Sequence, residues 1–412
     1  MESSIQRICH YLRAYFVELP ELYCSILVST MNTLIQFAMC GSGGEECNPY
    51  DITAPLERQR LLLLINSKSL SIEDIAKELD IPIDNVTKHI NELIRCGLVK
   101  EINGLYKPKF AIFTLNDQKI LQPLINSLVQ DVIDVVKDSM VDVRRVINSL
   151  TIVKRGLRFP DLEYIVVGAI TLDYEGLDIL SEEGLLIKSK KMPGGEYIFA
   201  GFEVGLIDLE KAWMWGHTGV FGRYYFSTHG KLPPKGIRLA FPDLAWLWHA
   251  QGTSPNDIES KMIEIGDILN TLLQGDSGFK DLRDLLGIDE INLIMDLSLL
   301  LTLKYIVVID KELWRLNIPI FTQNDYDNIK SLSKSILKII AKRFKNKLSV
   351  IRDYYSKTLP AKNDIPLEEA FNQIYHLVFE KALNSLIKDN VIKEPPLKLD
   401  NGKYSSFMII LE

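Results

Sequence analysis

Apolar positions between residues 60 and 110 follow helical spacing first and strand spacing afterwards. Residues 60–65 are rich in leucine and predict a buried helix. Segment 71–79 has one apolar face behind Ser71 and Asp74, whose spacing and charge suit a helix start. Pro82 separates it from a third amphipathic segment, 85–96. The pattern predicts three consecutive short helices.

Two short strands are expected after the third helix. Gly97 ends the helix, and segments 98–102 and 105–110 flank the dipeptide Asn103-Gly104. Asn-Gly is a strong signal for a two-residue hairpin turn. Three helices and a hairpin together predict a winged helix-turn-helix unit at about residues 56–112.

The third helix carries short polar and cationic side chains opposite its apolar face. Such groups reach base edges and phosphates in a major groove, and lysines of the hairpin can contact backbone phosphate. The candidate DNA-binding residues are Asn85, Thr87, Lys88, His89, Asn91, Arg95, Lys107 and Lys109.

The string LSIEDIAKELDIPIDNVTKHINELIRCGLVKEINGLYK at 70–107 resembles ArsR/MarR-like winged-helix transcription regulators of bacteria and archaea, and an archaeal type is expected. The resemblance covers about 55 of the 412 residues. It implies that helix 85–96 enters the major groove. Arsenic sensors of this family carry a cysteine pair on that helix, whereas this chain has only Cys96 there, so the resemblance implies no metal sensing.

Segments of the first winged helix recur 208 residues downstream. IFTLND at 112–117 returns as IFTQND at 320–325, and the apolar stripes of the helices that follow stay in register. This internal repetition predicts two units, at about 56–205 and 263–412. The expected fold class is mainly α with small β-hairpins (α+β), with two tandem winged-helix repeats, each followed by a long helix and a small helix-hairpin element.

These boundaries divide the chain into eight segments. The uncharged stretch 22–44 contains several polar residues, so we expect a buried packing or dimerisation helix there rather than a membrane span. The segments are an N-terminal helical segment (1–55), winged helix 1 (56–115), a long helix (116–150), a helix-hairpin element (151–205), an aromatic-rich linker module (206–262), a degenerate winged helix 2 (263–322), a long basic helix (323–358) and a C-terminal helix-hairpin element (359–412).

Charge distinguishes the two copies. Residues 56–110 hold nine Lys/Arg and eight Asp/Glu, whereas residues 264–320 hold five and ten. Segment 289–301 has no cation, so phosphate would repel it and we expect a buried packing helix. The long basic helix (323–358) has three possible roles: its cations contact DNA phosphates, it packs against the acidic long helix of copy one, or its basic face is simply exposed to solvent. Its stripe consists of Lys338, Lys342, Arg343, Lys345 and Lys347.

Composition narrows the classes of function. The net charge is −7, and the five cysteines and six histidines show no metal-ligand spacing. We expect a cytoplasmic chain with reduced thiols, no metal and no cofactor. No phosphate loop, dinucleotide fingerprint or nucleophile elbow is present, which favours a non-enzyme. The aromatic-rich region 197–248 is either an ordinary core or a pocket for a small-molecule effector.

The sequence therefore predicts a DNA-binding transcriptional regulator. Winged helix 1 reads the major groove of double-stranded DNA, and repeat 2 is a structural or dimerisation copy. One reading helix per chain predicts a homodimer on a palindrome, with no membrane association. The alternative is a tandem winged-helix scaffold for protein interaction without specific DNA binding, which the near-neutral charge of copy one favours.

Overall fold

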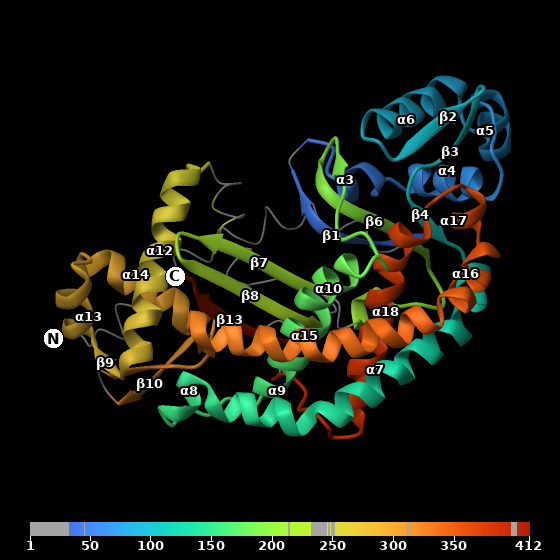
Figure 1. The fold of residues 1–412 in the computed structure, drawn as a ribbon. Coiled ribbons are helices and arrows are strands. Elements are labelled where there is room, and N and C mark those ends of the chain that lie inside the picture. The colour runs from blue at the N-terminus through green and yellow to red at the C-terminus, as the bar shows by residue number, and fades with distance from the viewer. Residues whose placement is uncertain are drawn as a thin grey trace.

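The computed structural model describes residues 33–44, 46–212, 215–231, 245, 248, 252–310, 313–396 and 402–412. Helices and small sheets are combined in one chain, so the α+β expectation is confirmed at that level (Figure 1). Residues 1–32 of the expected N-terminal helical segment lie outside the described residues. The chain falls into a first half (35–203) and a second half (215–410), which have related topologies.

The first half runs from one strand of a sheet, through helices and a hairpin, to a second strand of the same sheet. Its elements are β1 (Ile35–Gly43), α3 (Pro49–Thr53), α4 (Leu56–Ser67), α5 (Ile72–Leu79), α6 (Ile83–Arg95), β2 (Val99–Ile102), β3 (Leu105–Pro108), β4 (Ala111–Phe113), α7 (Leu115–Ser149), α8 (Thr151–Lys154), α9 (Leu162–Tyr164), a π-helix η2 (Ile165–Glu175), α10 (Gly176–Glu182), β5 (Lys191–Met192) and β6 (Gly195–Glu203).

The second half repeats this order with changes at its start and near its end. Its elements are β7 (Trp215–Phe221), β8 (Tyr224–Lys231), α12 (Pro255–Gln274), β9 (Ser277–Gly278), α13 (Phe279–Leu286), α14 (Glu290–Thr302), β10 (Ile306–Asp310), β11 (Leu313–Leu316), β12 (Ile320–Phe321), α15 (Gln323–Asn346), α16 (Leu348–Ser356), α17 (Leu359–Lys362), α18 (Leu367–Lys388) and β13 (Lys403–Ile410).

Each half builds a sheet with the same polarity. In the first half, β6 pairs antiparallel with β1 and parallel with β4. In the second half, β13 pairs antiparallel with β8 and parallel with β12. In each half, the strand that precedes the helical segment (β1 or β8) therefore belongs to the same sheet as the last strand of that half (β6 or β13).

A glycine lies opposite a tyrosine at the matching place of each sheet. Gly41 pairs with Tyr197 and has φ +120°, and Gly230 pairs with Tyr404 and has φ +157°. A Cβ atom at either glycine would lie 2.3 Å from a carbonyl oxygen of the facing strand. Glycine is required at both places, because only hydrogen fits against the facing backbone.

Two long helices, α7 and α15, run side by side through the core (Figure 1). Both begin with a capping box, formed by Thr114 with Asp117 and by Thr322 with Asp325. The helices α4–α6 with their hairpin form what we call the first three-helix unit (56–108), and α12–α14 with theirs form the second three-helix unit (255–316). The two units lie at opposite ends of the molecule (Figure 1).

Three expected boundaries differ from the structure. Residues 35–43, expected within a helix, form strand β1, because an uncharged run does not distinguish a buried strand from a buried helix. Within the expected linker 206–262, strands β7 and β8 join the second sheet. The expected long helix 323–358 is interrupted at Lys347, which separates α15 from α16.

Candidate nucleic-acid interface

Helix α6 is the element on which the expected interface depends. Val86, Ile90 and Leu93 are fully buried, at the spacing that brings apolar groups onto one side of a helix. The helix starts after Pro82 and ends before Gly97, which has φ +72°. The sequence pattern thus leaves the opposite side of α6 directed away from the core.

The outward side of α6 combines amide and cationic groups. Asn85, Lys88, Asn91 and Arg95 are all exposed, and they follow one another at three- and four-residue spacing. In the described part of the chain, neither Lys88 nor Arg95 forms an ion pair. Thr87 is half-buried, and its hydroxyl donates to the Ile83 carbonyl at 2.8 Å. Four of the candidate residues of α6 therefore form one accessible row.

His89 does not belong to this row, because its side chain is not directed outward as expected. Its side chain is only 14% exposed and lies against α4. Nδ1 accepts a hydrogen bond from Arg58 Nε at 3.2 Å, and Nε2 lies 3.1 Å from a Glu57 carboxylate oxygen. Arg58 also donates to the Ile52 carbonyl at 2.7 Å and pairs with Glu92. His89 and Arg58 therefore position α6 on α4.

The hairpin after α6 offers one accessible lysine at its base. Asn103 and Gly104 both have positive φ, as the Asn-Gly turn requires. Lys107 does not extend freely to solvent as expected, because it pairs with Asp364 of the second half. This hydrogen bond and the charge of Lys107 lower the pKa of Asp364. Lys109 is exposed and remains a candidate phosphate contact.

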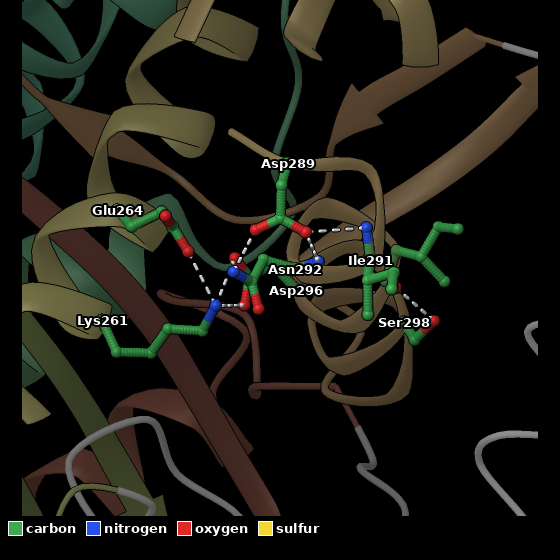
Figure 2. Close-up of polar contacts among 8 residues, drawn as sticks. Lys261, Glu264, Asp289, Ile291, Asn292, Asp296 and Ser298 are labelled. Carbon is green, nitrogen blue, oxygen red and sulfur yellow. Dashed lines mark hydrogen bonds and ion pairs between the residues drawn. The ribbon is translucent and has the colours of Figure 1, made fainter. Parts of the chain in front are cut away.

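The second three-helix unit differs in chemistry at the corresponding helix, α14. The α14 segment contains no Lys or Arg, and Asp289 caps it by accepting the amides of Ile291 and Asn292 at 3.0 and 3.1 Å. Figure 2 shows Lys261 between Glu264 and Asp296, with Nζ 2.7 Å from an oxygen of each. Burial and the hydrogen bond with Glu264 raise the pKa of Asp296 to about 7, against the opposing effect of Lys261.

The expectation that segment 289–301 is a buried packing helix holds for only one side of α14. Leu293 and Leu297 are fully buried, but Ile291 is 66% exposed and Met295 lies beside it at the surface. Leu285 on α13 is 71% exposed. The apolar sequence of α14 predicts burial on all sides, but Ile291 and Met295 on its outer side are exposed. This surface is apolar and acidic, which does not suit phosphate.

Most of the basic stripe on α15 is engaged within the molecule. Lys347 pairs with Asp131 of α7 and donates to Ser127 Oγ at 2.9 Å. Arg343 lies 3.8 Å from carboxylate oxygens of Asp131 and Asp134. Lys345 pairs with Glu183, at 2.5 Å. Packing against the acidic helix α7 accounts for Arg343 and Lys347, Lys345 pairs with the residue after α10 instead, and Lys338 and Lys342 are exposed.

Two cysteines contradict the expectation of reduced thiols. Cys47 and Cys96 form a disulfide that joins the loop before α3 to the end of α6, and both are buried. Cys40 is a free thiol in β1, and burial raises its pKa to about 12. The spacing of 49 residues between the bonded cysteines carries no recognisable disulfide signal.

Sequence reasoning missed a buried polar cluster where the halves meet. Tyr164 Oη lies 2.6 Å from His229 Nδ1, and His229 Nε2 lies 3.0 Å from an Asp173 carboxylate oxygen. Burial and the nearby Asp173 raise the pKa of Tyr164 well above its usual value. All three side chains are shielded from solvent. The residues are 56 or more positions from His229 along the chain, so no local motif could show their meeting.

Neither a metal-type cluster nor a membrane-spanning helix is found in the described ranges. No group of His, Cys, Asp and Glu side chains there has the arrangement of a metal site. Among the helices of those ranges, none combines the length and the apolar character needed to cross a bilayer. Comparisons of the chain with protein-family models, with curated proteins and with solved structures found no match.

Proposed function

We propose that this chain is a DNA-binding transcriptional regulator that places α6 in the major groove of double-stranded DNA. The observation that carries the proposal is the accessible row Asn85, Lys88, Asn91 and Arg95, whose two cations have no ion pair in the described part of the chain. An α-helix fits the major groove of B-DNA. Asn suits the hydrogen-bonding edge of adenine, and Arg suits that of guanine.

In this proposal the first three-helix unit is a winged helix of the ArsR/MarR-like type, and β2–β3 is its wing. The second unit is a degenerate winged helix that serves a structural or dimerisation role. Its acidic α14 supports this assignment, because Asp289 and Glu290 at the start of the helix would meet phosphate with like charge. One reading helix per chain is best used by a homodimer on a palindromic site.

In this proposal, the electrostatic contribution to DNA binding is small and comes from a few cations on and beside the first three-helix unit. The exposed cations of the proposed interface are Lys88 and Arg95 on α6 and Lys109 just after the hairpin. If each neutralises one phosphate, the logarithm of the binding constant falls with that of salt with a slope of roughly −3 per subunit. A cytoplasmic location is part of the proposal. The disulfide is compatible with it, since intracellular disulfides occur in hyperthermophilic archaea.

The test uses the full chain and a duplex selected by it from a random library. Lys88→Ala and Arg95→Ala should each weaken binding by roughly 5–150-fold, which corresponds to about 1–3 kcal/mol for a base-reading contact. Lys280→Ala, an exposed lysine of the second unit, is the matched control and should leave affinity unchanged. Unchanged affinity in both α6 variants would refute the proposal.

The scaffold function remains the second candidate, because Leu285, Ile291 and Met295 expose an apolar surface on the second unit. Such surfaces on a protein frequently mark interaction sites. Failure to select any duplex, together with a stoichiometric protein complex that Ile291→Ser disrupts, would favour this function over DNA reading.

A further inference from the structure

A cavity of about 330 Å³ lies between the two halves, beside the end of the π-helix η2. One wall consists of the end of η2, α10 and Lys188 beyond it, and the other is the middle of α15. Its volume is near the lower end of the range of small-molecule sites, roughly 300–1,000 Å³. The residues that matter for its chemistry are Glu175, Asp178, Ile179, Glu182, Lys330 and Lys334.

Carboxylates predominate on one wall and lysines form the other. Glu175, Asp178 and Glu182 come from the first half together with Lys188, which pairs with Asp178, and Lys330 and Lys334 come from α15 of the second half. An anion in this cavity would be repelled by the carboxylate wall, and a cation by the lysines. A molecule with a positive group at one end and a negative group at the other satisfies both walls.

Part of this charge is already compensated within the protein. Lys330 Nζ lies 3.5 Å from Glu175, whose carboxylate also accepts the Tyr326 hydroxyl at 2.8 Å. Asp178 pairs with Lys188. Glu182 and Lys334 are exposed and form no ion pair with the described residues. One anion and one cation, on facing walls, therefore remain available to a ligand.

The π-helix is an independent indication that this place has a local role. Residues 165–175 are π-helical and end at Glu175 in the cavity wall, whereas residues 373–383, which lie 208 positions later, are regular α-helix within α18. The repeated architecture therefore does not require the π conformation. π-helical turns are rare and occur frequently at functional sites.

We infer that this cavity binds a small zwitterion of the α-amino acid class. The ammonium group lies toward Glu182 and the carboxylate toward Lys334, and the ligand side chain packs over Ile179. Such a ligand ties α10 to α15 and thus links the two halves. Control of DNA binding by it rests on the proposed function, but binding itself does not.

The experiment is calorimetric titration of the full chain, without DNA, with each of the common amino acids. The tightest binder is then compared with its deaminated and decarboxylated counterparts. We expect one amino acid, or a group with similar side chains, to bind, and both counterparts to bind at least tenfold more weakly. Because DNA is absent, failure of the regulator proposal would not affect this result.

Variants locate the binding. Lys334→Ala and Glu182→Gln should each weaken binding at least tenfold, with circular dichroism confirming that the fold is retained. Lys338→Ala is the matched control, since this exposed lysine lies one turn further along α15 and outside the cavity lining. Binding by no amino acid, equal binding of the deaminated counterpart, or unchanged affinity in both cavity variants would each overturn the inference.

Discussion

Asp325 accepts two hydrogen bonds from Thr151, from the backbone amide at 2.9 Å and from the hydroxyl at 3.1 Å. Asp117, 208 residues before Asp325, accepts the amide of Leu359 at 2.9 Å, and Leu359 follows Thr151 by the same interval. Each carboxylate therefore caps its own long helix and also fixes the start of a short helix in the other half. The exchange is reciprocal, as in a dimer with a two-fold axis.

The first prediction concerns these two carboxylates. Asp325→Asn and Asp117→Asn should each lower the free energy of unfolding by about 1.5–3 kcal/mol, because an amide replaces a buried charged acceptor of several hydrogen bonds. Urea denaturation measures the change. The matched control is Asp327→Asn, an exposed position two residues further along α15, which should change stability by less than about 0.5 kcal/mol. Equal effects of all three variants would contradict the reciprocal arrangement.

The sequence predicts the elements with strong helical periodicity and those with a specific turn signal. Helices α5, α6 and α7 and the Asn103-Gly104 hairpin lie where the pattern indicates them. Strands β1 and β8 were not predicted, because their partners β6 and β13 lie more than 150 residues away and no local pattern shows such pairing. Repetition of the sequence begins after these strands, so the matching topology of the two sheets was also hidden.

The same distinction applies to the candidate interface. The outward direction of Lys88 and Arg95 follows from helical periodicity alone. His89 contacts Arg58 and Glu57, and Lys107 forms an ion pair with Asp364. These contacts depend on packing between segments that are distant in the sequence. Sequence can therefore indicate which cations are on a surface, but not which of them are already neutralised.

A second prediction asks whether a cation of the basic stripe, Lys347 at the end of α15, stabilises the fold or binds DNA. Lys347→Ala should reduce stability by roughly 1 kcal/mol, because it removes a partly buried ion pair with Asp131, and it should leave DNA affinity and its salt dependence unchanged. Denaturation and fluorescence anisotropy measure the two effects. Lys342→Ala, an exposed neighbour, is the control and should not change stability. If Lys347→Ala instead lowered DNA affinity and left stability unchanged, Lys347 would be a DNA phosphate contact.

A third prediction follows from the raised pKa of Asp296. Folded protein keeps the Asp296 proton up to about pH 7, whereas the unfolded chain releases it near pH 4. Between these pH values the folded state therefore binds more protons than the unfolded state. The contribution of Asp296 to the free energy of unfolding consequently falls as pH rises from 4 to 7. The upper limit is on the order of 1.4 kcal/mol for each pH unit.

Comparison with Asp296→Asn isolates this effect, because an amide does not titrate. At pH 4 the original protein should have the higher free energy of unfolding. This advantage over the variant should decrease as the pH is raised to 7. Glu259→Gln, an exposed position of α12, should show no such trend. A difference that does not vary with pH would mean that Asp296 is ionised throughout.

The last prediction concerns the disulfide between Cys47 and Cys96. It closes a loop of 49 residues that contains α3 to α6, and such a link typically stabilises by about 2–4 kcal/mol. Cys47→Ser with Cys96→Ser should lower the stability of the first three-helix unit by this amount. Dithiothreitol should destabilise the original protein but not the double variant, which controls for other effects of the reductant.

Because Cys96 immediately follows Arg95, loss of the link also loosens the end of α6 that carries this cation. DNA affinity should consequently fall with stability on reduction, and an affinity that is insensitive to reduction would show that α4 and its Arg58 network hold α6 without the disulfide.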